Sequence, residues 1–156
     1  MKPASSDGAI RIQGILGNAF RVLEFEQSTH SSAAAAAAIG CDVAQIAKSM
    51  LFKAVDGAPV LVVASGTNRV DEKKVAALLG QRISRADAAF VLDRTGFAVG
   101  GVPPVGHATP PVTFLDQDLQ VFPEIWAAAG SSNAVFALTP ADLARLTSAD
   151  FADVAK

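Results

Sequence analysis

Residues 97–107, FAVGGVPPVGH, combine residue types that can build a ligand-binding loop. The glycine pair, Gly100 and Gly101, lets the backbone approach a ligand closely and adopt positive φ angles. The two prolines that follow stiffen the chain and cannot donate a backbone hydrogen bond. The imidazole of His107 can accept a proton, orient a water molecule or bind a ligand. The same residues can also form a purely structural corner that the histidine closes, and both interpretations stay open at this point.

Lys48 is the second candidate, because it opens a largely apolar strand, KSMLFKAV, at residues 48–55. Strand alternation places Met50 on the same face as Lys48 and Ser49 on the opposite face. A lysine here can be a surface residue whose stem lies along the sheet while its ammonium stays in water. It can also present its charge to an anionic ligand. Lys53, the neighbouring lysine, is interpreted as a solvated edge residue.

Composition and charge exclude several classes of function. The 156 residues carry a net charge of −2 with scattered Lys and Arg, which argues against a surface that grips duplex DNA or RNA through many phosphates. Contact with one end of a nucleic acid stays open. No apolar stretch is long enough to span a membrane, and the N-terminus lacks the apolar core of a secretory signal. The single cysteine, Cys41, excludes an intrachain disulfide, fits a reducing cytoplasm and is interpreted as a packing residue.

No motif of a common metal- or cofactor-dependent enzyme is present. His30, His107 and Cys41 lie far apart in the sequence, without metal-ligand spacing. The chain also lacks a P-loop, a GxSxG nucleophile elbow and a dinucleotide-binding fingerprint. We therefore expect neither a metal ion nor a cofactor.

Apolar periodicity and turn residues outline the elements that must position these candidates. Asp56-Gly57 marks the turn of a central hairpin, and Asp71 and Gly80 bracket a helix. Hairpins mixed with scattered helices indicate an α+β domain rather than a doubly wound parallel sheet. We expect residues 1–10 to be a flexible N-terminus. Strands are predicted at residues 19–26, 48–55, 59–64, 97–100, 111–116 and 134–138, and helices at residues 33–38, 43–47, 72–79, 86–93 and 141–146.

The order of these segments resembles the YbaK/prolyl-tRNA synthetase editing-domain (INS-like) family of aminoacyl-tRNA deacylases. The resemblance rests on AKSMLFKA around Lys48, the helix DEKKVAALLG, TGFAVGGVPPVGH at residues 95–107 and GSSNAVFALTPADL at residues 130–143. It covers nearly the whole chain from about Phe20 onward. It implies a single domain, residues 1–156, with a mixed, strongly curved, barrel-like sheet and surrounding helices.

Such a resemblance implies a free-standing trans-editing hydrolase that cleaves the ester between a wrong amino acid and its tRNA, typically tRNA(Pro). Alanine, 2-aminobutyrate, cysteine and serine are the expected amino acids. The implied partners are the acceptor end of an aminoacyl-tRNA and a prolyl-tRNA synthetase, with no DNA and no membrane, in the cytoplasm. One alternative is a non-catalytic module that binds aminoacylated tRNA ends or adenosine-like ligands. Another is an interaction protein whose glycine loop is architectural.

The resemblance also assigns roles to the first candidates. Lys48 falls on the lysine that these deacylases need, and its ammonium would bind the phosphate or ribose of the terminal adenosine and so place the ester. Ester hydrolysis develops negative charge on the carbonyl oxygen, which preorganised donors stabilise. The backbone N–H groups of Gly100 and Gly101 are the expected donors, held by the rigid segment that Val102 and Pro103 begin.

Further residues are assigned to substrate binding by the same resemblance. His107 is expected to be a pocket residue rather than an obligatory base. His30 either lines the pocket or is a polar flank of the alanine-rich helix, and the GSSN segment is either a plain turn or the loop bordering the amino-acid pocket. The full substrate-binding set is His30, Met50, Val102, Pro103, His107, Gly130 and Ser131.

Three positions depart from the cysteine-specific pattern of the family. Ala128 and Val135 stand where polar residues are expected, and Phe25 replaces a tyrosine. These changes favour a pocket for a small, less polar side chain such as that of alanine or 2-aminobutyrate. Because one methylene changes binding by only about 1–3 kcal/mol, a second hydrolytic sieve is the physical remedy for mischarging.

Overall fold

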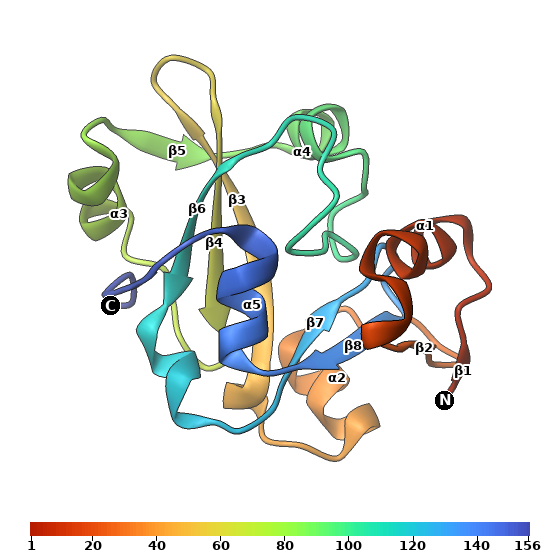
Figure 1. The fold of residues 1–156 in the computed structure, drawn as a ribbon. Coiled ribbons are helices and arrows are strands. Elements are labelled where there is room, and N and C mark those ends of the chain that lie inside the picture. Colours follow the sequence, from red (N-terminus) through yellow and green to blue (C-terminus); the bar gives the residue numbers. More distant parts are fainter.

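The computed structural model describes residues 1–156 and shows an α+β fold built on one curled, mixed, nine-stranded sheet (Figure 1). The sheet curls without closing, and the predicted fold class is confirmed. The strands are β1 (Lys2–Pro3), β2 (Val22–Glu24), β3 (Ile46–Ala54), β4 (Pro59–Ser65), β5 (Ile83–Arg85), β6 (Val112–Asp116), β7 (Ile125–Ala128), β8 (Ala134–Leu138) and β9 (Phe151–Ala152). The helices are α1 (Asp7–Leu16), α2 (Ser32–Ile39), α3 (Glu72–Leu79), α4 (Ala88–Thr95) and α5 (Pro140–Thr147), with 3-10 turns η1 (Gly17–Ala19), η2 (Val43–Gln45) and η3 (Gln117–Val121).

Strand β3 is the central strand, and its two edges differ. One edge pairs antiparallel with β4 over nearly its whole length. The other edge pairs parallel with β7 at Ile46 and Ala47, and antiparallel with β5 from Phe52 to Ala54. Residues 48–51 have no strand partner on that second edge. The sheet therefore opens at the position of Lys48.

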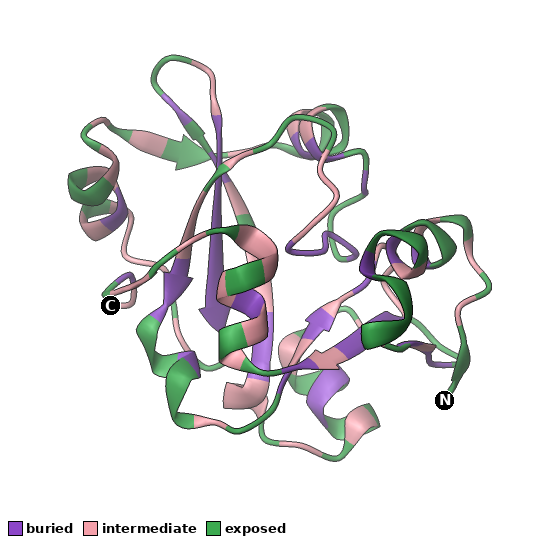
Figure 2. Ribbon diagram, viewed as in Figure 1, coloured by how far each residue is buried: buried purple, intermediate pink, exposed green.

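Two hydrophobic cores hold the β3–β4 hairpin from opposite faces. Alternate residues of β4 enter different cores, as the two-residue period of a strand requires. Leu61 and Val63 join the larger core, against α5, and Val60 and Val62 join the smaller core, against α3. Every residue of β4 is buried (Figure 2). The hairpin that carries Lys48 is thus anchored on both sides.

Local signals predicted several elements correctly. The helix expected at residues 72–79 is α3, with Asp71 as its N-cap and Gly80 in the left-handed conformation after it. The central hairpin is also confirmed. The helix predicted at residues 43–47 is only the 3-10 turn η2, because Ile46 already belongs to β3. The strand predicted at residues 97–100 is wrong, because the glycines there favour a turn instead.

The N-terminus differs from the expected flexible segment at residues 1–10. Lys2 and Pro3 pair with β2, and α1 begins at Asp7. The buried carboxylate of Glu24 accepts four hydrogen bonds of 2.6–3.0 Å from the main-chain N–H groups and hydroxyls of Ser5 and Ser6. Burial alone would raise the pKa of Glu24, but these hydrogen bonds outweigh it and lower the pKa to about 2. A serine-rich stretch that reads as flexible therefore becomes ordered because a distant buried acid needs its donors.

Candidate active site

A mostly apolar cavity of about 550 Å³ lies beside the opening in the sheet edge. Its walls come from the N-terminal flank of α2, from β3, from the glycine loop and from β7 with the turn that follows it. This size suits a small ligand group. The lining residues used below are His30, Ala35, Ile46, Lys48, Met50, Gly66, Gly100, Val102, Trp126, Ala128, Ser131 and Val135.

Lys48 lines this cavity with its ammonium group held in place. The Nζ atom donates a hydrogen bond to the main-chain oxygen of Asn68 at 2.7 Å. Burial lowers the pKa of Lys48, the nearby cation of Arg69 lowers it further, and the carboxylate of Asp116 opposes them. An ammonium has three donors, so the contact with Asn68 leaves others for a ligand. The partly desolvated charge can bind an anionic or carbonyl oxygen.

The glycine loop offers one free main-chain donor rather than two. Gly100 lines the cavity with a φ of 96°, and its N–H has no acceptor in the protein. The N–H of Gly101 instead donates to the main-chain oxygen of Ala98 at 3.1 Å, closing a turn. This geometry corrects the expectation that both amides are available.

Gly101 has a packing reason to be glycine. A Cβ atom there would lie 2.7 Å from the main-chain Cα and C atoms of Ser131. The main-chain oxygen of Gly101 also accepts a hydrogen bond from the N–H of Gly130 at 3.0 Å. Gly101 therefore joins the glycine loop to the β7–β8 turn, and Gly100 faces the cavity.

His107 and Pro103 lie outside the cavity lining. The Nε2 atom of His107 is 2.6 Å from the main-chain oxygen of Pro103, so the imidazole closes its own loop. Burial lowers the pKa of His107, although the contact with Pro103 raises it in part. The structural interpretation of this histidine fits the geometry better than the expected place in the pocket.

We expect replacement of His107 by alanine to lower the free energy of unfolding by about 1–3 kcal/mol, because it removes a half-buried hydrogen-bonded ring. The activity that the family resemblance implies should be retained. The folded protein holds the pKa of His107 below its ordinary value of 6.5, so the unfolded chain binds the proton first. Stability from this group is therefore present above pH 6.5 and lost as the pH falls below it.

Calorimetric unfolding between about pH 7.5 and pH 5.5 checks this prediction. The slope of stability against pH should become shallower in His107→Ala. An unchanged slope in His107→Ala would refute the assignment.

Of the other expected site residues, some line the cavity and one lies outside it. His30, Met50, Val102 and Ser131 line the cavity together with Lys48 and Gly100. Gly130 does not line the cavity. Its φ of 96° and its packing explain why this residue is glycine, because a Cβ there would lie 2.4 Å from the main-chain oxygen of Gly8 in α1. The N-terminal helix thus supports the turn that presents Ser131.

Several cavity residues were not predicted from the sequence. Trp126, the single tryptophan, lies on β7, a strand that was not predicted, and it lines the cavity beside Ile46. Gly66 is also a lining residue, and a Cβ there would lie 2.4 Å from the main-chain oxygen of Val43. The turn sequence SGTN, which begins at the last residue of β4, is the feature of the sequence that could have indicated Gly66.

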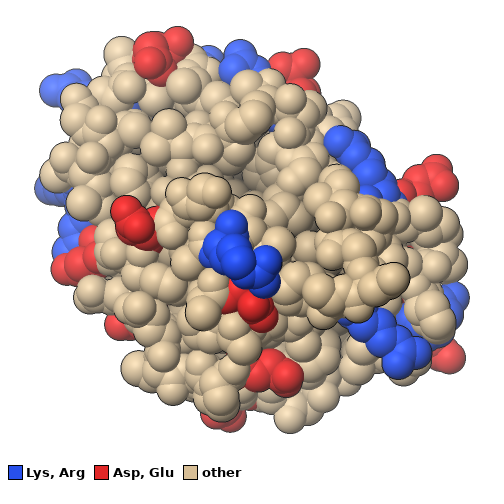
Figure 3. Space-filling model, in the orientation of Figure 1, with Lys and Arg blue, Asp and Glu red and all other residues tan.

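Three further features concern the surface charge, possible metal ligands and the helices. Lys and Arg are scattered among acidic and uncharged residues on the face drawn in Figure 3. No group of three or more His, Cys, Asp or Glu side chains is arranged to hold a metal ion. No helix combines the length and apolar character that crossing a membrane requires.

Comparison with known proteins places this site in a family. Residues 26–146 match the family described as the aminoacyl-tRNA editing domain. YwhH, an uncharacterised protein of Bacillus subtilis (strain 168), is 36% identical over 126 residues, which cover 81% of this chain and 80% of YwhH. EbsC of Enterococcus faecalis (strain ATCC 700802 / V583), named as a proposed Cys-tRNA(Pro)/Cys-tRNA(Cys) deacylase, is 26% identical over 125 residues, covering 80% and 76% of the two chains. A crystal structure described as a proposed trans-editing enzyme for prolyl tRNA synthetase is 43% identical, covers 98% of this chain and 99% of its own, and has a TM-score of 0.93.

Proposed function

The chain belongs to the aminoacyl-tRNA editing domain family, and from that premise we propose that it is a free-standing deacylase that removes small amino acids from mischarged tRNA(Pro). The observation that supports the proposal is the shared cavity: it is lined both by Lys48, which carries an ammonium group, and by Gly100, whose N–H has no acceptor in the protein. The relatives named for deacylation and for trans-editing support the choice of tRNA(Pro). The acceptor end of the tRNA would be the main contact, since the chain has few basic residues.

Lys48 and Gly100 would act on different parts of the substrate. The ammonium of Lys48 binds the phosphate or ribose of the terminal adenosine, which fixes the ester in the cavity. The N–H of Gly100 points to the carbonyl oxygen, where negative charge develops. Water adds to the carbonyl carbon, the bond from that carbon to the ribose oxygen breaks, and the ribose oxygen takes the proton that the water loses. The products are a free amino acid and a free tRNA 3′ end.

The cavity lining supports a preference for small, weakly polar side chains. Ala35, Ala128 and Val135, which have small apolar side chains, line it, whereas Phe25 is buried outside the lining. A side chain no larger than that of 2-aminobutyrate would find apolar contacts there. Discrimination by size then works as a sieve that prolyl esters do not pass.

A larger side chain in the cavity wall should change the relative rates at which different amino acids are released. We expect Ala128→Leu to lower kcat/KM for 2-aminobutyryl-tRNA about tenfold more than for alanyl-tRNA, because the added carbons occupy the space of the longer side chain. Ala38→Leu adds the same atoms to an exposed position of α2 outside the cavity and should change neither value. Equal losses for both substrates in Ala128→Leu would contradict the assignment of this wall to the amino-acid side chain.

Release of amino acid from a panel of charged tRNA(Pro) tests the proposal. The panel carries alanine, 2-aminobutyrate, cysteine, serine and proline, and we expect hydrolysis of small non-cognate esters with the prolyl ester spared. Trp126 lines the cavity and is the single tryptophan, so its fluorescence reports binding in the same samples. Saturable quenching without release of any amino acid would instead indicate the non-catalytic binding module.

A further inference from the structure

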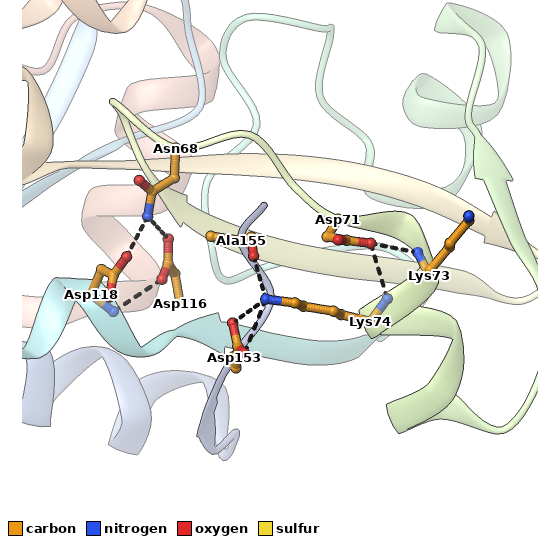
Figure 4. A network of polar contacts seen from close by, with 8 residues as sticks. All are labelled: Asn68, Asp71, Lys73, Lys74, Asp116, Asp118, Asp153 and Ala155. Atoms are coloured by element: carbon orange, nitrogen blue, oxygen red, sulfur yellow. Dashed lines mark hydrogen bonds and ion pairs between the residues drawn. The ribbon is translucent and has the colours of Figure 1, made fainter.

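Asn68 lies beside Asp116 and Asp118, and its side-chain amide contacts both carboxylates (Figure 4). It follows β4 in a turn in which its N–H donates to the main-chain oxygen of Ser65 at 2.9 Å. Its side-chain amide donates to Asp116 Oδ2 and to Asp118 Oδ2, each at 2.8 Å. Its main-chain oxygen accepts the Lys48 ammonium at 2.7 Å. Asn68 is thus bonded on one side to two carboxylates and on the other to Lys48.

The carboxylate of Asp116 is held in place by burial and by hydrogen bonds. It ends β6, is fully buried, and accepts hydrogen bonds from the N–H groups of Ser65 and Asp118, each at 3.0 Å. Together with the Asn68 amide, these donors satisfy a buried carboxylate that would be costly without them. Asp116 therefore holds the loop at Asn68 against the main sheet.

The C-terminal segment secures the same loop from its other end. The N–H of Lys156 donates to the main-chain oxygen of Arg69 at 3.0 Å, and the N–H of Asp71 donates to that of Val154 at 2.8 Å. The Lys74 ammonium binds the Asp153 carboxylate at 2.9 Å and so ties that segment to α3 (Figure 4). Loop residues 66–71 are consequently held on both sides of Asn68.

We infer that Asn68 is a positioning residue for Lys48, and that the buried carboxylate of Asp116 is its anchor. The inference rests on the proposed function, because it assigns Asn68 a role through the ammonium that places the ester. The carboxamide suits this position, because its NH₂ group donates to both Asp116 and Asp118. An aspartate there would bring three carboxylates together.

Removal of the anchor should affect turnover more than binding. We expect Asn68→Ala to lower kcat about ten- to a hundredfold, with a much smaller change in KM, because a displaced ammonium misaligns the ester. Gln81→Ala is the matched control: its side-chain amide also bridges to an aspartate, Asp56, but outside the cavity lining. The control should keep full turnover. Equal kcat in Asn68→Ala and the wild type would overturn the inference.

An isosteric variant distinguishes positioning from mere structural support. In Asn68→Asp the donor is lost near neutrality, and a proton taken up at lower pH restores it. The activity of Asn68→Asp relative to the wild type should therefore rise as the pH falls. The double variant Asn68→Asp with Asp118→Asn supplies a donor from the other side and should recover part of the lost kcat. Absence of both effects would count against the role of the amide.

A readout independent of activity separates this inference from the proposed function. The NMR order parameter of the Lys48 ε-CH₂ group should be high in the wild type and fall, in Asn68→Ala, to that of the exposed Lys73. A wild type that releases no amino acid would refute the proposed function, and the order parameter would still decide the placement of Lys48. An unchanged order parameter in Asn68→Ala would refute the inference whatever the activity.

Discussion

Replacement of Lys48 by alanine should lower single-turnover deacylation of alanyl-tRNA(Pro) by about a hundred- to a thousandfold, the usual effect of losing one preorganised electrostatic contact. The side chain is half-buried in the cavity wall and makes one hydrogen bond, to Asn68, so its removal should leave the fold intact. Rapid quench kinetics measure the rate, and circular dichroism checks the fold. Unchanged turnover would remove Lys48 from the mechanism.

Two further measurements sharpen this prediction. Lys53→Ala is the matched control, because Lys53 lies on the same strand but is exposed and outside the cavity lining. It should retain full activity.

The pKa of Lys48 is lowered by burial, so its ammonium loses its proton at a lower pH than an ordinary lysine does. Activity that depends on this charge should therefore decline as the pH rises through the lowered pKa, and Lys48→Arg should shift the decline to higher pH.

The second large effect on kcat is expected from exchange of one main-chain N–H group, that of Gly100. Exchange of the Gly100 amide for an ester, by incorporation of glycolic acid at position 100, replaces its N–H with an oxygen. If this N–H stabilises the developing oxyanion, kcat should fall by about a hundred- to a thousandfold. Stability should change little, since this N–H has no acceptor in the free protein.

The same exchange at Gly101 is the matched control. Its N–H already donates to the main-chain oxygen of Ala98, so the ester should lower stability by about 1 kcal/mol and affect kcat less. Chemical denaturation and single-turnover rates of the two esters make the comparison. A larger loss of kcat at position 101 than at position 100 would reverse the assignment of the donor.

Local sequence signals predicted the elements that carry the site. Asp71 and Gly80 marked both ends of α3, and the Asp56-Gly57 turn marked the central hairpin. Strand alternation put Lys48 and Met50 on one face, and both line the cavity, but Ser49 from the opposite face lines it as well. These features are encoded within a few residues of one another, so the sequence alone reveals them.

Features that depend on distant partners could not be predicted in this way. The free N–H of Gly100 and the bonded N–H of Gly101 differ through the turn with Ala98, although the two glycines look equivalent in the sequence. The anchoring of Asn68 by Asp116 joins residues 48 positions apart. The ordered structure of the N-terminal residues depends on Glu24, and no local sequence pattern indicates that Glu24 is buried.

The most direct test of the account is the NMR spectrum of the protein with a non-hydrolysable analogue, 3′-(alanylamino)-3′-deoxyadenosine. The central claim is that the Lys48 ammonium and the Gly100 N–H hold the two ends of one aminoacyl ester in one cavity. We predict that the analogue shifts the Gly100 amide and the Lys48 side-chain signals together, and leaves the bonded Gly101 amide less affected. Binding that shifts neither Gly100 nor Lys48, or that shifts residues only outside the cavity, would contradict it.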